Sequence, residues 1–177
     1  MKKITMISSI LIVILLSACG STGPEKFTSE EGAFSVISPL PLEESTQSID
    51  TELGLIEVHF FMAEQVDRAY MVGYSDYPQD FVDQSDPQAM LDGARDGAVG
   101  NINGKLVSEI KVLLDDQYPG REIVVTAMLD QDQEGTLKER MFLVGNRLYQ
   151  VMVIAPSGDM GVQEMDEFIN SFKLLKP

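Results

Sequence analysis

The fold is decided by one stretch, MFLVGNRLYQVMVI, residues 141–154. Two continuous apolar runs flank the dipeptide Gly145-Asn146, and a two-residue turn of this kind between apolar runs predicts a β-hairpin. Because apolar residues occupy consecutive positions, both faces of these strands are predicted to be buried. The hairpin is therefore expected to belong to a sheet that forms the middle layer of the protein.

Strand signals continue on the N-terminal side of this hairpin. Pro119-Gly120 joins an apolar run at 110–114 to another at 122–129, and Asp130 to Gly135 joins that run to the hairpin. Four consecutive antiparallel strands are therefore predicted. Residues 39–50 show no strand pattern and are expected to form an irregular connection. Further strands are predicted at 34–37, 55–62 and 68–77.

Two helices are predicted beside this sheet. Asp86 can cap a helix whose first residue is Pro87, and apolar residues follow at helical spacing. Gly93 and Gly97 lie four residues apart in this helix and are interpreted as letting it approach the sheet closely. A second helix is predicted over residues 160–172. The expected fold class is α+β, a three-layer α/β/α sandwich around a mainly antiparallel sheet.

Five segments of the chain carry a family resemblance. They are residues 74–78, the helix with Ala94 and Gly97, YPGRE at 118–122, FLVGNRLYQ at 142–150 and SFKL at 171–174. Together they resemble uncharacterised bacterial proteins of the PsbP-like fold, over most of residues 33–175. The resemblance implies an antiparallel sheet between helices. It implies little about function, because members range from photosystem assembly factors to proteins of unknown role and share no catalytic motif.

Length and composition indicate one domain. The 177 residues, 44% hydrophobic and 23% charged, suit one well-cored domain and are few for two. The formal net charge is −15, and removal of Lys2 and Lys3 with a leader would bring it to −17. Such a charge repels phosphate groups and anionic lipid headgroups, which argues against nucleic-acid binding and against a polybasic membrane contact.

The N-terminus has the pattern of a lipoprotein leader. Basic residues precede an apolar run at 10–16, which is shorter than the roughly 20 apolar residues of a membrane-spanning helix. The segment Leu16-Ser17-Ala18-Cys19 resembles the lipobox of bacterial lipoproteins, in which the cysteine receives a diacylglyceryl group and acyl chains such as palmitate. Cys19 is also the only cysteine. We expect a signal peptide at 1–18, a lipidated Cys19 with a tether to residue 26, and one globular PsbP-like domain at 27–177.

The predicted anchor implies a location for the protein. More than one acyl chain holds a protein stably on a bilayer. We therefore expect the chain on the cell membrane or outer membrane, with its domain on the extracytoplasmic side. Gly20 stands where an aspartate would signal inner-membrane retention in Gram-negative lipoproteins, and this resembles the outer-membrane pattern.

No catalytic set is predicted, and no cofactor is implied. His59 is the only histidine, so a histidine-based zinc site or a Ser-His or Cys-His pair has no basis. Ser108 and Lys111 have the spacing of a serine acyl-enzyme motif, but on a strand residues three apart face opposite sides. Asp115 and Asp116 diverge for a similar reason. We therefore do not expect an enzyme.

Two acidic segments offer oxygen ligands. Asp130 to Gly135 begins like a calcium loop, but Met141 stands where the bidentate glutamate is required, so a solvated turn is the better interpretation. A larger acidic loop precedes the first helix, and a solvated loop is again the simpler interpretation. Its candidate cation ligands are Asp76, Asp80, Asp83 and Asp86.

These features favour a non-catalytic envelope lipoprotein that binds an envelope protein or assists assembly at the membrane surface. The alternative is a lipoprotein that binds a small ligand or a cation through the acidic loop between Asp76 and Asp86. An enzyme built from carboxylates such as Asp115 and Asp116 is a third possibility.

Overall fold

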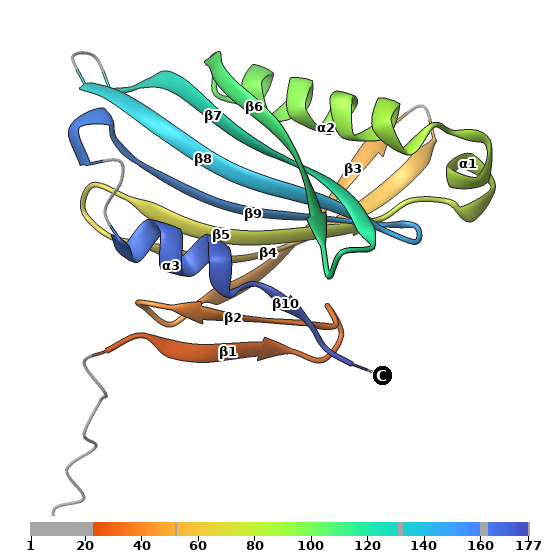
Figure 1. Cartoon of the computed structure of the whole chain (residues 1–177), viewed down its shortest axis with the longest axis horizontal. Helices are drawn as coiled ribbons and strands as arrows, with labels where there is room; N and C mark the ends of the chain where they lie inside the picture. Colours follow the sequence, from red (N-terminus) through yellow and green to blue (C-terminus); the bar gives the residue numbers. More distant parts are fainter. Residues whose placement is uncertain (1–22, 52, 131–132, 160–162, 177) are drawn as a thin grey trace, which may run out of the picture.

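A seven-stranded antiparallel sheet organises the chain (Figure 1). The computed structural model describes residues 23–51, 53–130, 133–159 and 163–176. The strand order is β3-β4-β5-β9-β8-β7-β6, and every neighbouring pair is antiparallel. The strands are β3 (Glu43–Thr51), β4 (Gly54–Glu64), β5 (Ala69–Asp76), β6 (Lys105–Leu114), β7 (Tyr118–Asp130), β8 (Gln133–Val144) and β9 (Arg147–Pro156).

Helices cover both faces of this sheet. Helix α2 (Pro87–Asn101), preceded by α1 (Gln79–Gln84), packs on one face, and α3 (Gln163–Ser171) packs on the other, after a 3-10 turn at Ser157–Asp159 (Figure 1). None of the helices in the described part of the chain has the length and apolarity that a bilayer crossing requires. The α+β class and the mainly antiparallel sheet are thereby confirmed.

A second, smaller sheet shares the third layer with α3. It consists of β1 (Glu25–Ser29), β2 (Phe34–Ser38) and β10 (Lys173–Leu174), with β2 in the middle. This sheet brings the first and last described strands together below the large sheet (Figure 1). Only its middle strand was predicted, because β1 and β10 are short and largely polar.

The predicted meander is confirmed. Strands β6, β7, β8 and β9 follow one another in space as in sequence, and the β8-β9 hairpin closes through Val144 and Arg147. Gly145 has a φ of 61°, the left-handed conformation that such two-residue turns require. The flanking strands are buried on both faces along much of their length, as the continuous apolar runs predicted.

The expected irregular connection at residues 39–50 is wrong. Strand β3 occupies most of it and pairs with β4 over nine residues, from Glu43 opposite Met62 to Thr51 opposite Gly54. Eight of its nine residues are exposed. Because this edge strand has no buried face, it has no apolar alternation, and alternation is the signal by which strands are predicted.

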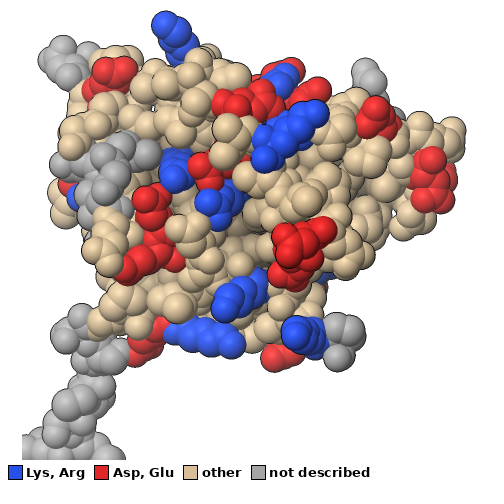
Figure 2. All heavy atoms as spheres, viewed as in Figure 1, with Lys and Arg blue, Asp and Glu red and all other residues tan. Residues whose placement is uncertain are grey.

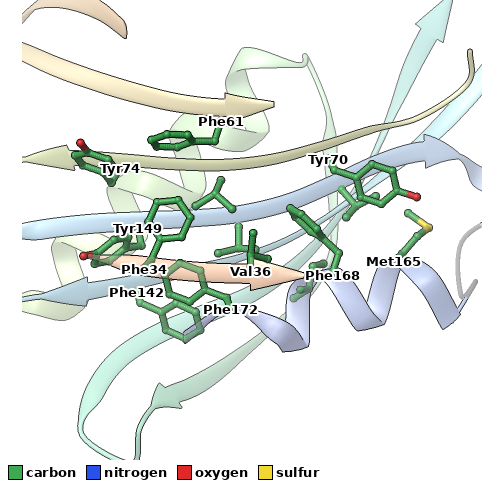
Figure 3. Packing of buried hydrophobic residues seen from close by; sticks show 14 of the residues in the cluster. Phe34, Val36, Phe61, Tyr70, Tyr74, Phe142, Tyr149, Met165, Phe168 and Phe172 are labelled. Atoms are coloured by element: carbon green, nitrogen blue, oxygen red, sulfur yellow. The ribbon is translucent and has the colours of Figure 1, made fainter. Parts of the chain in front are cut away.

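One hydrophobic core lies between the large sheet and the third layer (Figure 3). Phe34 is fully buried at its centre and contacts Phe61, Tyr149 and Phe172 with ring centroids 5.3, 6.4 and 5.6 Å away. Helix α3 contributes Met165, Phe168 and Ile169 to the same core. These contacts hold the small sheet and α3 against the large sheet.

A second core lies on the opposite face, beneath α2. The Asp86 side chain accepts a hydrogen bond from the backbone N–H of Gln88 at 2.7 Å, so the predicted helix cap is confirmed. Only Leu91 and Ala98 of α2 are buried. They pack on inward residues of the three strands β7, β8 and β9: Ile123, Val125, Leu137, Met141, Leu143 and Leu148, with Met152 and Ile154.

Candidate functional site

An open cleft of about 670 Å³ lies beside the second core. Helices α1 and α2 form one wall, and strands β3, β4, β5 and β9 form the other. A volume of this size lies within the range of small-molecule binding sites. Most of the lining is apolar, with Ile49, Ile56, Val58, Phe60 and Leu148 from the strands and Phe81, Ala89, Met90, Ala94 and Ala98 from the helices.

Two glycines of α2 open the cleft. Gly93 and Gly97 line it, and a Cβ atom built on either would meet no atom within 4 Å. The prediction that they allow close contact with the sheet is therefore wrong. Their four-residue spacing does place them on one helix face, but that face is turned to the cleft, and Leu91 and Ala98 make the close contact instead.

The polar side chains of the lining are largely engaged by the fold. The hydroxyls of Thr51 and Ser85 donate to backbone carbonyls at 2.8 and 2.7 Å. Asp86 caps α2, and the amide of Gln150 donates to Glu139 at 2.8 Å. Among the described residues that line the cleft there is no lysine, arginine or histidine. The lining therefore suits an apolar ligand, and it has no basic side chain that could bind an anionic ligand.

Glu139 is a buried carboxyl next to this cleft. It lies on β8 between Leu137 and Met141, on the face that α2 covers, and its side chain is completely buried. Its Oε1 atom accepts from Gln150, whereas its Oε2 atom is buried and has no hydrogen-bond partner in the described part of the chain. Burial raises the pKa of Glu139 to about 7, although the hydrogen bond from Gln150 acts in the opposite direction.

The predicted acidic set does not come together as one site. The two carboxylate oxygens of Asp76 accept from Arg147 at 2.6 Å each, and Asp83 accepts from the Gln79 amide at 2.7 Å. Asp86 alone lines the cleft, where it caps α2. Across the described residues, no group of three or more histidine, cysteine, aspartate or glutamate side chains is arranged to hold a metal.

His59 lies away from the cleft, in a stack of polar and aromatic groups. Its ring is 4.5 Å from the ring of Tyr74 and nearly parallel to it, and its Nδ1 atom shares a hydrogen bond with Thr46 at 3.2 Å. The guanidinium of Arg147 lies 4.3 Å from the centre of the same Tyr74 ring and is held by Asp76. This stack joins β3, β4, β5 and β9 at one end of the sheet.

The remaining candidates do not form a site. Ser108 and Lys111 are both in β6, as expected, three residues apart on one strand. Asp115 and Asp116 have φ angles of 53° and 56° and make the turn between β6 and β7. Cys19 lies outside the described residues, as do residues 131–132 of the loop that begins like a calcium site.

A second buried charged group fastens α2 to the sheet from its other side. Arg121 on β7 is 3% exposed, and its guanidinium contacts Glu109 at 2.8 Å and Asp92 at 3.1 Å. Arg95 on α2 also contacts Glu109, at 3.0 Å. Two arginines and two acids thus link α2, β6 and β7. Sequence reasoning did not find this network, because its members are charged residues on three separate elements.

Comparison with known proteins identifies solved structures with a similar fold. No family model and no curated protein matches the chain. The solution structure of cyanobacterial PsbP (CyanoP) from Synechocystis sp. PCC 6803 superposes with a TM-score of 0.54, over 90% of this chain and 98% of that chain. The chain has the PsbP fold. The two sequences are 11% identical, so the likeness shows the PsbP fold and nothing about activity.

A crystal structure of a Pseudomonas aeruginosa protein of unknown function also matches this PsbP-fold chain. Its TM-score is 0.40 at 8% identity, over 78% of this chain and 86% of that chain. The predicted resemblance to the PsbP-like fold is therefore confirmed by the Synechocystis structure.

On the face of the PsbP-fold domain shown in Figure 2, the charged side chains are distributed and not concentrated. In the view of Figure 2, acidic and basic side chains are interspersed over the surface. Several charged side chains of the domain form ion pairs, such as Arg95 with Asp96 and Lys138 with Asp166. On this face the net negative charge therefore does not form a single acidic patch.

Proposed function

We propose that this chain is a membrane-anchored envelope lipoprotein whose domain is a non-catalytic module that binds a small, mainly apolar ligand. The observation that carries the proposal is the cleft of about 670 Å³ beneath α2, with its apolar walls and its two glycines. Because no side chain of the fold fills the cleft, its apolar walls are exposed to water. A ligand that buries this apolar surface gains about 25 cal/mol per Å².

The chemistry of the lining limits the ligand class. The hydroxyls of Thr51 and Ser85 are bound to backbone carbonyls, so the cleft offers few free hydrogen-bond partners. The charged group of the lining is the carboxylate of Asp86, and the whole chain carries a charge of −15. A neutral or cationic ligand with an apolar body therefore fits better than an anion.

The lipid anchor is supported by the similarity of residues 16–19 to a lipobox. Five residues lie between Cys19 and Glu25, the first residue of β1, and the six steps of extended chain from Cys19 to Glu25 span at most about 20 Å. Strand β1 lies on the opposite side of the large sheet from α2 (Figure 1). An anchored domain would therefore turn its small sheet towards the bilayer and its cleft away from it.

Ligand binding is tested with N-phenyl-1-naphthylamine, a neutral apolar dye whose fluorescence rises in apolar sites. We expect saturable binding to the wild-type domain and a loss of about tenfold or more in affinity for Gly97→Leu, since one leucine side chain in the cleft displaces several dye contacts. The matched control is Gly100→Leu. Gly100 lies in the same helix, outside the cleft lining, and also has open space around it.

The two variants separate blocking from unfolding. Both replace a glycine by a good helix former, so both are expected to keep or raise the thermal stability of the domain. Equal dye binding by wild type, Gly97→Leu and Gly100→Leu would show that the dye does not occupy the cleft, and the proposal would be wrong.

The anchor is tested by labelling cells with radioactive palmitate. We expect the label on the wild-type protein and none on Cys19→Ala, and we expect the wild type alone to sediment with membranes. Labelling of Cys19→Ala, or equal sedimentation of both proteins, would contradict lipidation at Cys19.

A second candidate function, binding of an envelope protein, is favoured by the free edge of β6. This strand is the last of the seven, and its exposed side chains include Val107, Ile110 and Leu113, which are 59%, 56% and 60% exposed. An unpaired edge with apolar side chains can accept a strand from another protein. The opposite edge, β3, is mostly polar, and its one exposed large apolar side chain is Ile49, which lines the cleft.

Crosslinking in native membranes tests this second function. A photo-crosslinking residue at Val107 is expected to capture one envelope protein reproducibly, whereas the same group at Ser48 on β3 is expected to capture none. Equal capture from both edges would indicate nonspecific contact and would contradict a binding edge at β6.

A further inference from the structure

We propose that the ligand of the cleft carries a primary ammonium head, which binds at the Gln150 carbonyl with the Glu139 carboxylate behind it as its counter-charge. This inference rests on the proposed function of the cleft, since it names the polar end of the apolar ligand. Three observations support it: an unpartnered buried carboxyl oxygen, the fixed orientation of one amide, and a lining without basic side chains.

The first observation is the surroundings of Glu139. Its register partners are Ile123 on β7 and Met152 on β9, and Leu137 and Met141 flank it along β8. No arginine, lysine or histidine contact is present within the described residues; the one hydrogen bond comes from Gln150. A buried carboxylate without a cation is costly, and an added cation would offset that cost. When it is ionised, Glu139 therefore carries a negative charge that no cation of the described residues compensates.

The second observation is the orientation of Gln150, which lines the cleft from β9. Above its pKa of about 7 the Glu139 carboxylate only accepts hydrogen bonds, and the NH₂ group of Gln150 donates to it, with Nε2 2.8 Å from Oε1. The acceptor that remains for the cleft is the amide carbonyl.

The third observation is the sign of the charges around the cleft. Asp86 is the charged residue of the lining, and it is acidic. Arg95 on α2 and Arg121 on β7, which covers the same core, are already paired with Glu109 and Asp92. The charges of the lining and of Glu139 behind it are therefore negative, which favours an ammonium head over a hydroxyl and disfavours a carboxylate.

The test uses octylamine, octanol and octanoate as competitors of N-phenyl-1-naphthylamine, at pH 8 and fixed ionic strength. The three compounds share one apolar chain and differ in the head group. We expect octylamine to displace the dye at a concentration about tenfold or more below that of octanoate and below that of octanol, because a charge-assisted hydrogen bond in a partly desolvated site contributes about 1.5–3 kcal/mol.

Two variants assign this preference to the proposed groups. Glu139→Gln removes the charge with almost no change in volume, and Gln150→Leu removes the carbonyl acceptor. In each variant the advantage of octylamine is measured as the ratio of the octanol and octylamine concentrations that displace half of the bound dye, and this ratio does not depend on the affinity of the dye itself. In both variants we expect the ratio to fall to less than about threefold. A retained advantage in both variants would overturn the assignment to Glu139 and Gln150.

The result also distinguishes this inference from the proposed function. If the dye binds and Gly97→Leu blocks it, but the three octyl compounds compete equally or octanol competes best, the cleft binds apolar ligands and the ammonium head is wrong. If the dye does not bind, the proposed function itself fails.

Discussion

The side chains of Gln150 and Glu139 form a partly buried hydrogen bond of 2.8 Å between adjacent strands, in which the amide donates to a carboxyl that pairs with no cation among the described residues. Burial raises the pKa of Glu139 from 4.5 to about 7. The unfolded chain therefore releases this proton at lower pH than the folded chain does, and this linkage makes stability fall as pH rises from about 4.5 to about 7.

Glu139→Gln is expected to remove this loss of stability. Between pH 4.5 and pH 8, the free energy of unfolding of the variant should rise relative to wild type by about 3 kcal/mol, which is the difference in pKa expressed as energy. Urea unfolding of both proteins at the two pH values measures it. The same difference at both pH values would mean that Glu139 does not change protonation in this range.

Alanine substitutions at three glycines are expected to change the stability of the domain in opposite directions. Gly93→Ala and Gly97→Ala place a Cβ in open space and reduce the entropy of the unfolded chain, so each should stabilise the domain by about 0.5–1 kcal/mol. At Gly120 a Cβ would lie 2.5 Å from the carbonyl oxygen of Met141, so Gly120→Ala should destabilise it. Thermal unfolding ranks the three, and a destabilised Gly93→Ala would contradict the open cleft.

The buried ion network predicts unequal effects for its two arginines. Arg121→Met removes the more buried guanidinium and leaves Glu109 with Arg95 alone, so it should cost about 3 kcal/mol. Arg95→Met should cost less, about 1 kcal/mol, because its side chain is 21% exposed and Arg121 remains in place. Chemical unfolding of the two variants gives the comparison, and equal costs would show that burial does not set the energetics of the network.

The aromatic core predicts strong dependence on Phe34. Phe34→Ala removes a fully buried ring that contacts four other aromatic residues, and we expect a cost of about 3–5 kcal/mol. Ile37→Ala, on the same strand, is the control: Ile37 is 46% exposed and should cost about 0.5 kcal/mol or less. Comparable losses in the two variants would mean that the small sheet contributes little packing against the large one.

The parts of the fold with a burial pattern were predictable from sequence. The 141–154 hairpin, the meander around it and the capped helix at Pro87 each combine apolar periodicity with a turn or cap residue. Strand β3 lacked that pattern because it is exposed at the sheet edge. Its pairing depends on β4, and a contact between segments leaves no trace in the local sequence.

The candidate site was less predictable than the fold. Glu139 lies in the polar segment 133–140, where a charged residue suggests exposure. One signal was available: Leu137, Glu139 and Met141 alternate, which places the carboxyl on the same face as its apolar neighbours. The spacing of Gly93 and Gly97 shows that they share one face of α2, but it does not show whether that face is turned to the sheet or to the cleft. The rotation of α2 about its axis decides this, and it is set by the burial of Leu91 and Ala98.

The composition of α2 has a consequence for motion. Three glycines in its fifteen residues each lower the intrinsic stability of the helix by about 1 kcal/mol relative to alanine, and two buried side chains anchor it. Backbone amides in α2 should therefore exchange with deuterium sooner than those of β8 and β9, through local opening that leaves the sheet intact. A ligand bound against α2 would suppress this local opening. Slower amide exchange in α2 alone would therefore report that the cleft is occupied, without any label on the ligand.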